Sequence, residues 1–250
     1  MITKAELQGI ASFKRLTLVN AELDYFLDIC LNTISRVGHG LVFKGGTALY
    51  KFHNLNRFSE DLDFVAEKRK VKLQSLLEEI VRSCHLLGIA SRFSEAEQHQ
   101  RSVSLQMFFN GPLYDGSKGS SARVTIDISL RERPFFIERL RYTPLFKDLG
   151  SFELKLLRID ELLAEKVRAV MTREKPRDVY DVWFLLKKGI KIDPNLVDKK
   201  LRLNGLKFSK GSFIDAALRK EGLWESDLRR VIIGNFPRLD DVIKDITSLL

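Results

Sequence analysis

The sequence predicts an α+β protein, in which a mixed α/β region is followed by a mostly helical C-terminal region. Three observations predict this class. Short apolar strands alternate with helical stripes up to about residue 130, a glycine turn separates a strand from a helix near residue 45, and the pattern is helical from Arg158 almost to Leu250. We expect a first domain over residues 1–150 and a helical domain over residues 151–250.

The first elements follow from the spacing of apolar residues. A clean helical stripe predicts a helix over residues 20–36, and the apolar run 41–43 predicts a strand. A second helix is expected over residues 47–53, directly after two glycines. Residues 61–65 alternate between polar and apolar and are typical of a second strand.

The rest of the first domain continues in the same way. Residues 71–87 predict a helix, and residues 89–94 and 102–109 predict strands. A Gly/Ser-rich turn then precedes a strand over residues 122–130. In the C-terminal region, prolines and glycines mark the helix breaks, at Pro176, Gly189, Gly205, Gly211 and Pro237.

Composition excludes several classes of protein. With 44% hydrophobic and 30% charged residues, the chain is expected to be globular and not disordered. It has no run of 18 apolar residues and no signal-peptide pattern, so no membrane association and a cytoplasmic location are expected. Its two cysteines are expected to be buried thiols, and its four histidines lack the spacing of a zinc site.

The positive charge is concentrated in the C-terminal third. The formal net charge is +9, and residues 187–230 contain twelve Lys/Arg against six Asp/Glu. Such a balance favours an anionic partner, of which nucleic acid is the commonest. A solvated, lysine-rich helix face would give the same count, so charge alone leaves both interpretations open.

Two acids one residue apart are the first candidate site. On a strand, Asp61 and Asp63 would project to one side while Leu62 and Phe64 point into the core. Carboxylates held so close repel each other, and a divalent cation is the usual compensation. An isolated pair of this kind is nevertheless more often a solvated strand face.

The preceding turn strengthens the functional interpretation. Gly45, Gly46 and Thr47 stand where a strand passes into a helix, and glycines with free N–H groups at a helix start favour a bound phosphate. Arg57 and Ser59 precede the acids closely enough to reach the same phosphate. A loop arginine is as often a surface residue.

A third acid, Asp127, occupies the centre of the polar face of its predicted strand. If that strand lies beside the first acid pair, three carboxylates converge. Three acids around two Mg²⁺ ions are used by enzymes that transfer phosphoryl or nucleotidyl groups in line.

The first C-terminal helix carries an unusual lysine. On a helical wheel Lys166 falls in the middle of the apolar stripe, where a lysine must snorkel, pair or serve a site. Its neighbours Glu165 and Arg168 fall outside the stripe and are expected to be solvated.

The next helix supplies a possible partner for this lysine. Asp181 lies on its inward face, so Lys166 and Asp181 form either a structural ion pair or part of a phosphate-binding site. Asp178 is expected to stabilise the helix N-terminus or to orient Arg177.

Four aromatic residues remain outside these motifs. Phe108, Phe109, Phe135 and Phe136 could stack on bases, but pairs of this kind more often pack in the core or at its edge. We expect packing.

These motifs together resemble a known family. The order GGT, RFSEDLDF, the IDI strand and LLRIDELLAEKVRAVMTREKPRDVYDVWFLL is similar to the DNA polymerase β-like nucleotidyltransferase superfamily, and within it to the AbiEii/MenT toxins of type IV toxin–antitoxin systems. The resemblance covers roughly residues 40–190. The family's usual Gly-Ser is Gly-Thr here, which keeps the hydroxyl.

The resemblance implies a Mg²⁺-dependent nucleotidyltransferase toxin that adds a nucleoside monophosphate from an NTP to the 3′ end of tRNA, with a cognate antitoxin. It implies metal ligation by Asp61, Asp63 and Asp127, and activity that depends on Lys166 and Asp181. Two alternatives remain. One is a transferase of the same fold that modifies a small molecule or a protein hydroxyl, and the other is an inactive module that binds RNA or a partner.

Overall fold

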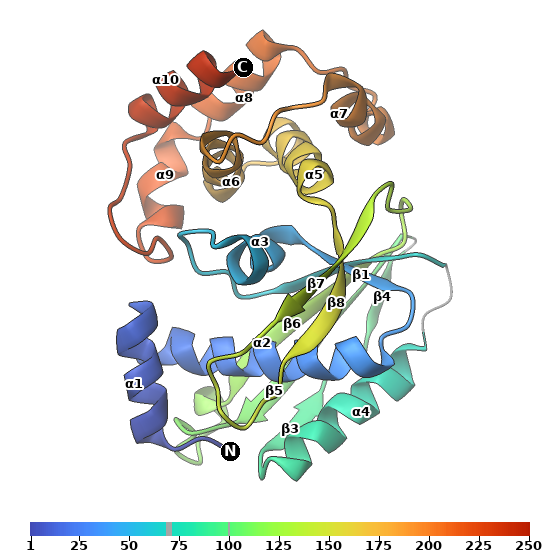
Figure 1. Ribbon diagram of the computed structural model, residues 1–250, viewed down its shortest axis with the longest axis vertical. Helices are drawn as coiled ribbons and strands as arrows, with labels where there is room; N and C mark the ends of the chain where they lie inside the picture. Colours follow the sequence, from blue (N-terminus) through green and yellow to red (C-terminus); the bar gives the residue numbers. More distant parts are fainter. Residues whose placement is uncertain (69–71, 100) are drawn as a thin grey trace. The chain divides into compact units, whose positions relative to one another are not determined.

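The computed structural model describes residues 1–68, 72–99 and 101–250, and the chain divides into two compact units (Figure 1). The first unit comprises Met1–Asn54 and Phe58–Leu157, and the second comprises Leu55–Arg57 and Arg158–Leu250. The predicted class, a mixed sheet followed by a helical region, is confirmed. In these ranges none of the helices has the length and hydrophobicity that a membrane crossing requires.

Within the described residues, the first unit is built on an eight-stranded mixed sheet of order β3-β5-β6-β2-β1-β8-β7, with β4 added on β5. The pairs β1–β8 and β2–β6 are parallel, and the others are antiparallel. The strands are β1 (Leu41–Lys44), β2 (Leu62–Ala66), β3 (Ala90–Phe93), β4 (Glu97–His99), β5 (Ser102–Asn110), β6 (Ala122–Ser129), β7 (Ile137–Tyr142) and β8 (Phe152–Leu157).

One face of this sheet is apolar and is covered by helices. Helix α2 (Leu18–Val37) packs over β6 and β8, and the rings of Phe26 and Phe109 stack with centroids 4.4 Å apart. Helix α4 (Leu73–Leu86) packs beside α2 and against β3, and α1 (Lys4–Lys14) packs on α2. Because side chains alternate along a strand, the polar residues of β2 and β6 face the opposite side.

The structure differs from the sequence prediction at several boundaries. Strands β7 and β8 were not expected, and β8 lies beyond residue 150 because it pairs with β1, so the first unit extends to Leu157. Helix α2 begins at Leu18, since the Thr17 side chain accepts a hydrogen bond from the Asn20 N–H and caps the helix. Val71, the expected start of α4, lies outside the described residues. Both cysteines are buried thiols, as expected.

The second unit is helical and is centred on two adjoining helices, α5 (Ile159–Thr172) and α6 (Pro176–Lys187). Pro176 is the first residue of α6, a position at which the main-chain N–H has no partner within the helix, so the missing N–H of proline costs no hydrogen bond. Around this pair lie α7 (Pro194–Leu201), α8 (Lys210–Leu218), α9 (Glu221–Leu228) and α10 (Leu239–Leu249).

Helix α3 (Gly45–His53) is held on α2 by buried charges. The Lys51 ammonium lies 2.5 Å from Asp24 Oδ1 and 2.6 Å from Asp28 Oδ1, and all three side chains are inaccessible to solvent. Lys14 of α1 contacts the second oxygen of Asp24, at 2.5 Å. The two ammonium groups and two carboxylates balance in charge, so removal of one leaves a buried charge uncompensated. This cluster fixes the helix that carries the glycine turn.

Replacement of Lys51 by methionine should therefore lower the free energy of unfolding by about 3–5 kcal/mol, because two buried carboxylates lose their main partner. Urea unfolding followed by circular dichroism measures this difference. The control is Lys4→Met, which removes an exposed lysine of α1 and should change stability by less than about 0.5 kcal/mol. Equal effects of the two substitutions would contradict the role of the buried cluster.

Candidate active site

The glycine turn fits closely against the strand that carries the acids. Gly45 follows β1 with φ of +79°, a conformation that favours glycine. A Cβ atom built on Gly45 would lie 2.2 Å from Asp63 Oδ2 and 2.8 Å from Asp63 Cβ. The absence of a side chain at position 45 therefore allows the turn to approach Asp63.

Thr47 connects the turn to the residue before β2. Its hydroxyl donates a hydrogen bond of 2.5 Å to the main-chain carbonyl of Asp61, and the residue is fully buried. The sequence had suggested the Thr47 side chain as a phosphate contact. In this structure the hydroxyl instead fixes the segment that leads into the acidic strand.

Asp63 and Asp127 lie side by side. They are opposite each other in the parallel pairing of β2 and β6, and both are half-buried. Their neighbours Leu62 and Ile126 are buried and point to the apolar face, so the two carboxylates project from the other face. The predicted proximity of these two acids is confirmed.

The register extends this pair into a row across four strands. Lys44 is paired with Asp63, and Ser104 is paired with Asp127. We call Lys44, Asp63, Asp127 and Ser104 the carboxylate row. Sequence reasoning missed Lys44, although its position immediately before the glycine turn was a usable signal. A lysine beside the acid pair reduces their mutual repulsion.

Asp61 is placed differently from the other two acids. It precedes β2 and is exposed, so strand alternation does not fix the direction of its side chain. Among residues 1–68, 72–99 and 101–250, no three carboxylate, imidazole or thiol side chains form a ready metal-binding group. Two carboxylates in register suit a shared divalent cation, with Asp61 as the candidate third donor.

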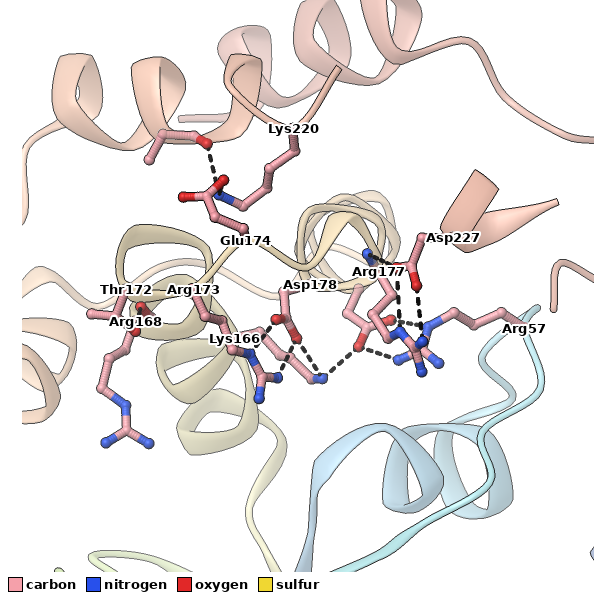
Figure 2. Close-up of polar contacts among 12 residues, drawn as sticks. Arg57, Lys166, Arg168, Thr172, Arg173, Glu174, Arg177, Asp178, Lys220 and Asp227 are labelled. Atoms are coloured by element: carbon pink, nitrogen blue, oxygen red, sulfur yellow. Dashed lines mark hydrogen bonds and ion pairs between the residues drawn. The ribbon is translucent and has the colours of Figure 1, made fainter. Parts of the chain in front are cut away.

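In the second unit, Lys166 of α5 is enclosed by two aspartates of α6 (Figure 2). Its ammonium lies 2.7 Å from Asp181 Oδ2 and 3.0 Å from Asp178 Oδ1. Burial lowers the pKa of Lys166, but the charges of Asp181 and Asp178 outweigh burial and raise it above the ordinary value. Lys166 therefore stays charged, and the predicted Lys166–Asp181 pair is confirmed.

Arg57 completes this cluster. Its Nε and Nη2 donate two hydrogen bonds of 2.6 Å each to the Asp181 carboxylate, and both residues are buried. The main chain of Arg57 forms an isolated antiparallel β-bridge with Ile232, and the Ile233 N–H donates a hydrogen bond of 2.9 Å to the carbonyl of Asn56. The sequence had suggested Arg57 as a phosphate contact, whereas in this structure it orients Asp181. Ser59, suggested for the same role, is buried in the first unit.

Asp178 plays a part that the sequence did not indicate. Arg173 donates to it through Nε and Nη2, at 2.6 and 2.8 Å, whereas Arg177 pairs with Asp227. Burial alone would raise the pKa of Asp178, but Lys166 and Arg173 together hold it well below the usual range. Asp178 lies in the first turn of α6, which agrees with the expected position at the helix N-terminus, but its carboxylate points toward α5, and the alternative partner Arg177 pairs with Asp227.

The prediction that Glu165 is solvated is also wrong. Glu165 is buried and accepts a hydrogen bond of 3.1 Å from Lys200 of α7, which also donates to Glu161 at 2.7 Å. Arg168 is half-buried. A wheel of α5 alone could not show that α7 covers this flank.

Comparison with known proteins identifies the family. Residues 30–244 match the profile of the AbiEii nucleotidyltransferase toxins of type IV toxin–antitoxin systems. The chain belongs to the AbiEii family. It is thus a nucleotidyltransferase, and its family suggests an antitoxin as partner. No curated protein matches the chain.

Solved structures share the AbiEii fold at low sequence identity. MenT4, a nucleotidyltransferase toxin from Mycobacterium tuberculosis, is 21% identical, with a TM-score of 0.67 over 100% of this chain and 90% of that one. JHP933 from Helicobacter pylori is 17% identical, with a TM-score of 0.60 over 92% of this chain and 89% of that one.

The glycine turn of this AbiEii protein yields a direct prediction. Gly45→Ala should abolish nucleotidyl transfer and lower the melting temperature, since the new Cβ would overlap Asp63 and force a strained φ. Gly9→Ala is the control, because Gly9 lies inside α1 with open space around its Cβ, and this change should stabilise the protein by about 0.5–1 kcal/mol. An active Gly45→Ala protein would contradict the close approach.

The Asp178 carboxylate should make stability depend on pH. The pKa of Asp178 is lower in the folded protein than in the unfolded chain, where it is near 4. The ionised carboxylate therefore adds to the free energy of unfolding above pH 4, and this addition is lost as the pH falls below 4. Asp178→Asn should therefore lower the free energy of unfolding by about 3 kcal/mol at pH 7 and by clearly less at pH 3. Urea unfolding at both pH values measures this, with the exposed Asp240→Asn as the control. A pH-independent difference would exclude this titration.

Proposed function

We propose that the protein transfers a nucleoside monophosphate from an NTP to the 3′ end of tRNA in a Mg²⁺-dependent reaction, which blocks translation. The observation that carries the proposal is the pairing of Asp63 with Asp127 beside the Gly45 turn. Two carboxylates next to a glycine turn at a helix start are a suitable combination for nucleotidyl transfer.

The carboxylates would bind the metal that the reaction requires. Asp61 and Asp63 would hold two Mg²⁺ ions, and Asp127 would complete the coordination of one of them. Bound Mg²⁺ supplies positive charge to the triphosphate and lowers the pKa of the attacking hydroxyl. The main-chain N–H groups at the start of α3, from Gly45 to Thr47, would orient the phosphates of the NTP.

Lys166 would stabilise the negative charge that builds up as pyrophosphate leaves. Its charge is secured by Asp181, which is itself oriented by two hydrogen bonds from Arg57. In this proposal Asp181 is a positioning residue and Lys166 the group that acts on the substrate. The family resemblance supports the assignment, since both residues fall on its motif.

The positive charge of the C-terminal third supports an RNA acceptor, although not all twelve of its lysines and arginines are available to bind RNA. Lys200 and Lys220 are buried and serve the interior, Lys200 through Glu161 and Glu165. Ten of the twelve basic residues in 187–230 therefore remain as candidates for phosphate contacts.

Incubation of the protein with each labelled NTP and total tRNA tests the proposal. Label should enter tRNA in the presence of Mg²⁺, and not when EDTA is added or when periodate has destroyed the 3′ ribose. Asp63→Asn and Asp127→Asn should reduce transfer by about 10³-fold or more, whereas the exposed Asp240→Asn should leave it unchanged. Label in protein or small molecules, and none in RNA, would overturn the choice of acceptor.

A further inference from the structure

A small pocket lies in the first unit, at the end of β2 and β6 away from the glycine turn. It has a volume of about 270 Å³. Its lining consists of residues that leave the two strands: Ala66, Glu67, Lys68, Leu130, Arg131, Glu132 and Arg133. The three basic residues of this set are exposed at its rim.

The acids of the pocket leave a positive balance. Glu67 accepts a hydrogen bond of 2.7 Å from Lys155 of β8, so its charge is matched from the neighbouring strand. Glu132 is then the single lining carboxylate set against Lys68, Arg131 and Arg133. Two guanidinium groups and an ammonium around a cavity of this size suit a phosphate group.

The position of the pocket relative to the carboxylate row is informative. β1 and β2 are antiparallel, so Gly45, at the end of β1, lies beside the start of β2. The pocket lies at the other end of β2, three residues beyond Asp63, or about 10 Å along the strand. Along the strand direction, the glycine turn and the pocket are therefore on opposite sides of the acids.

This arrangement matches the needs of an in-line transfer. The nucleophile and the leaving pyrophosphate lie on opposite sides of the reacting phosphorus. If the triphosphate rests at the glycine turn, the acceptor chain approaches from the side of the pocket.

Two exposed aromatic residues adjoin the pocket in sequence. Phe135 and Phe136 are 47% and 39% exposed and follow Arg133 closely enough to lie within about 10 Å of it. They were expected, with Phe108 and Phe109, to pack in the core or at its edge; Phe109 is fully buried, whereas Phe135 and Phe136 keep much of their surface exposed. Arginines next to exposed aromatic rings are the combination that binds single-stranded nucleic acid, through phosphates and base stacking.

We propose that this pocket, with Arg131 and Arg133, binds a backbone phosphate of a single-stranded RNA acceptor whose 3′ end reaches the carboxylate row, while Phe135 and Phe136 stack on its bases. The proposal rests on the proposed function and adds to it the site that holds the acceptor.

The test measures binding of a labelled single-stranded RNA by fluorescence anisotropy, without NTP, and the KM values for RNA and NTP separately. The double variant Arg131→Ala/Arg133→Ala should weaken RNA binding about tenfold or more and reduce the salt dependence of log K by roughly 0.7, for the one phosphate that the pocket no longer neutralises. The KM for NTP should stay unchanged. Phe135→Ala should weaken binding without altering the salt dependence.

Matched controls come from the helices of the same unit. Arg82 of α4 and Phe13 of α1 are exposed, and Arg82→Ala and Phe13→Ala should leave RNA binding unchanged. RNA binding that is unaffected by the Arg131/Arg133 change, or weakened as much by Arg82→Ala, would overturn the pocket while the transferase function stands. Arginine-dependent RNA binding without transfer to RNA would support the pocket and overturn the proposed function. A wild-type protein that binds no RNA would overturn the pocket.

Discussion

The close approach of the Gly45 turn to Asp63 is the constraint on which the first unit's site depends. The main chain at Gly45 lies so close to the Asp63 carboxylate that no Cβ atom fits between them. The antiparallel pairing of the adjacent strands β1 and β2 brings the two residues together. The same pairing places Lys44 opposite Asp63, and the parallel pairing of β2 with β6 adds Asp127. One local fit thus relates the glycine turn to both acids of the row.

Each of the two units is held together by a buried charge network of its own. In the first unit, Lys51 connects α3 to two aspartates of α2, so the helix behind the glycine turn cannot shift without exposing buried charges. In the second unit, Arg57, Lys166 and Asp181 form a comparable buried chain. In both networks a cation meets more than one carboxylate, or a carboxylate more than one cation. Each charged side chain at the centre of a network is therefore held in place by several partners at once.

The sequence predicted those parts of the fold in which local pattern and burial agree. The strands around Asp63 and Asp127 were recognisable because apolar residues alternate with polar ones and face α2. Strand β8 carries the same alternation but was not recognised, and it is defined by its pairing with β1, about a hundred positions earlier; β7 is an edge strand with exposed arginines. The Arg57–Asp181 contact spans 124 positions. No spacing rule reaches so far, and only the folded chain reveals that this arginine serves an aspartate.

The assignment of Leu55–Arg57 to the second unit has a consequence for the chain as a whole. Neither unit is a continuous stretch of sequence, since three residues between α3 and β2 belong with helices that begin about a hundred positions later. A fragment starting at Arg158 would retain the Lys166–Asp181 pair and lose the Arg57 guanidinium, which donates two hydrogen bonds to Asp181. The contacts of the helical unit are therefore not contained in one continuous stretch of the chain, and its Asp181 depends on an arginine that precedes β2.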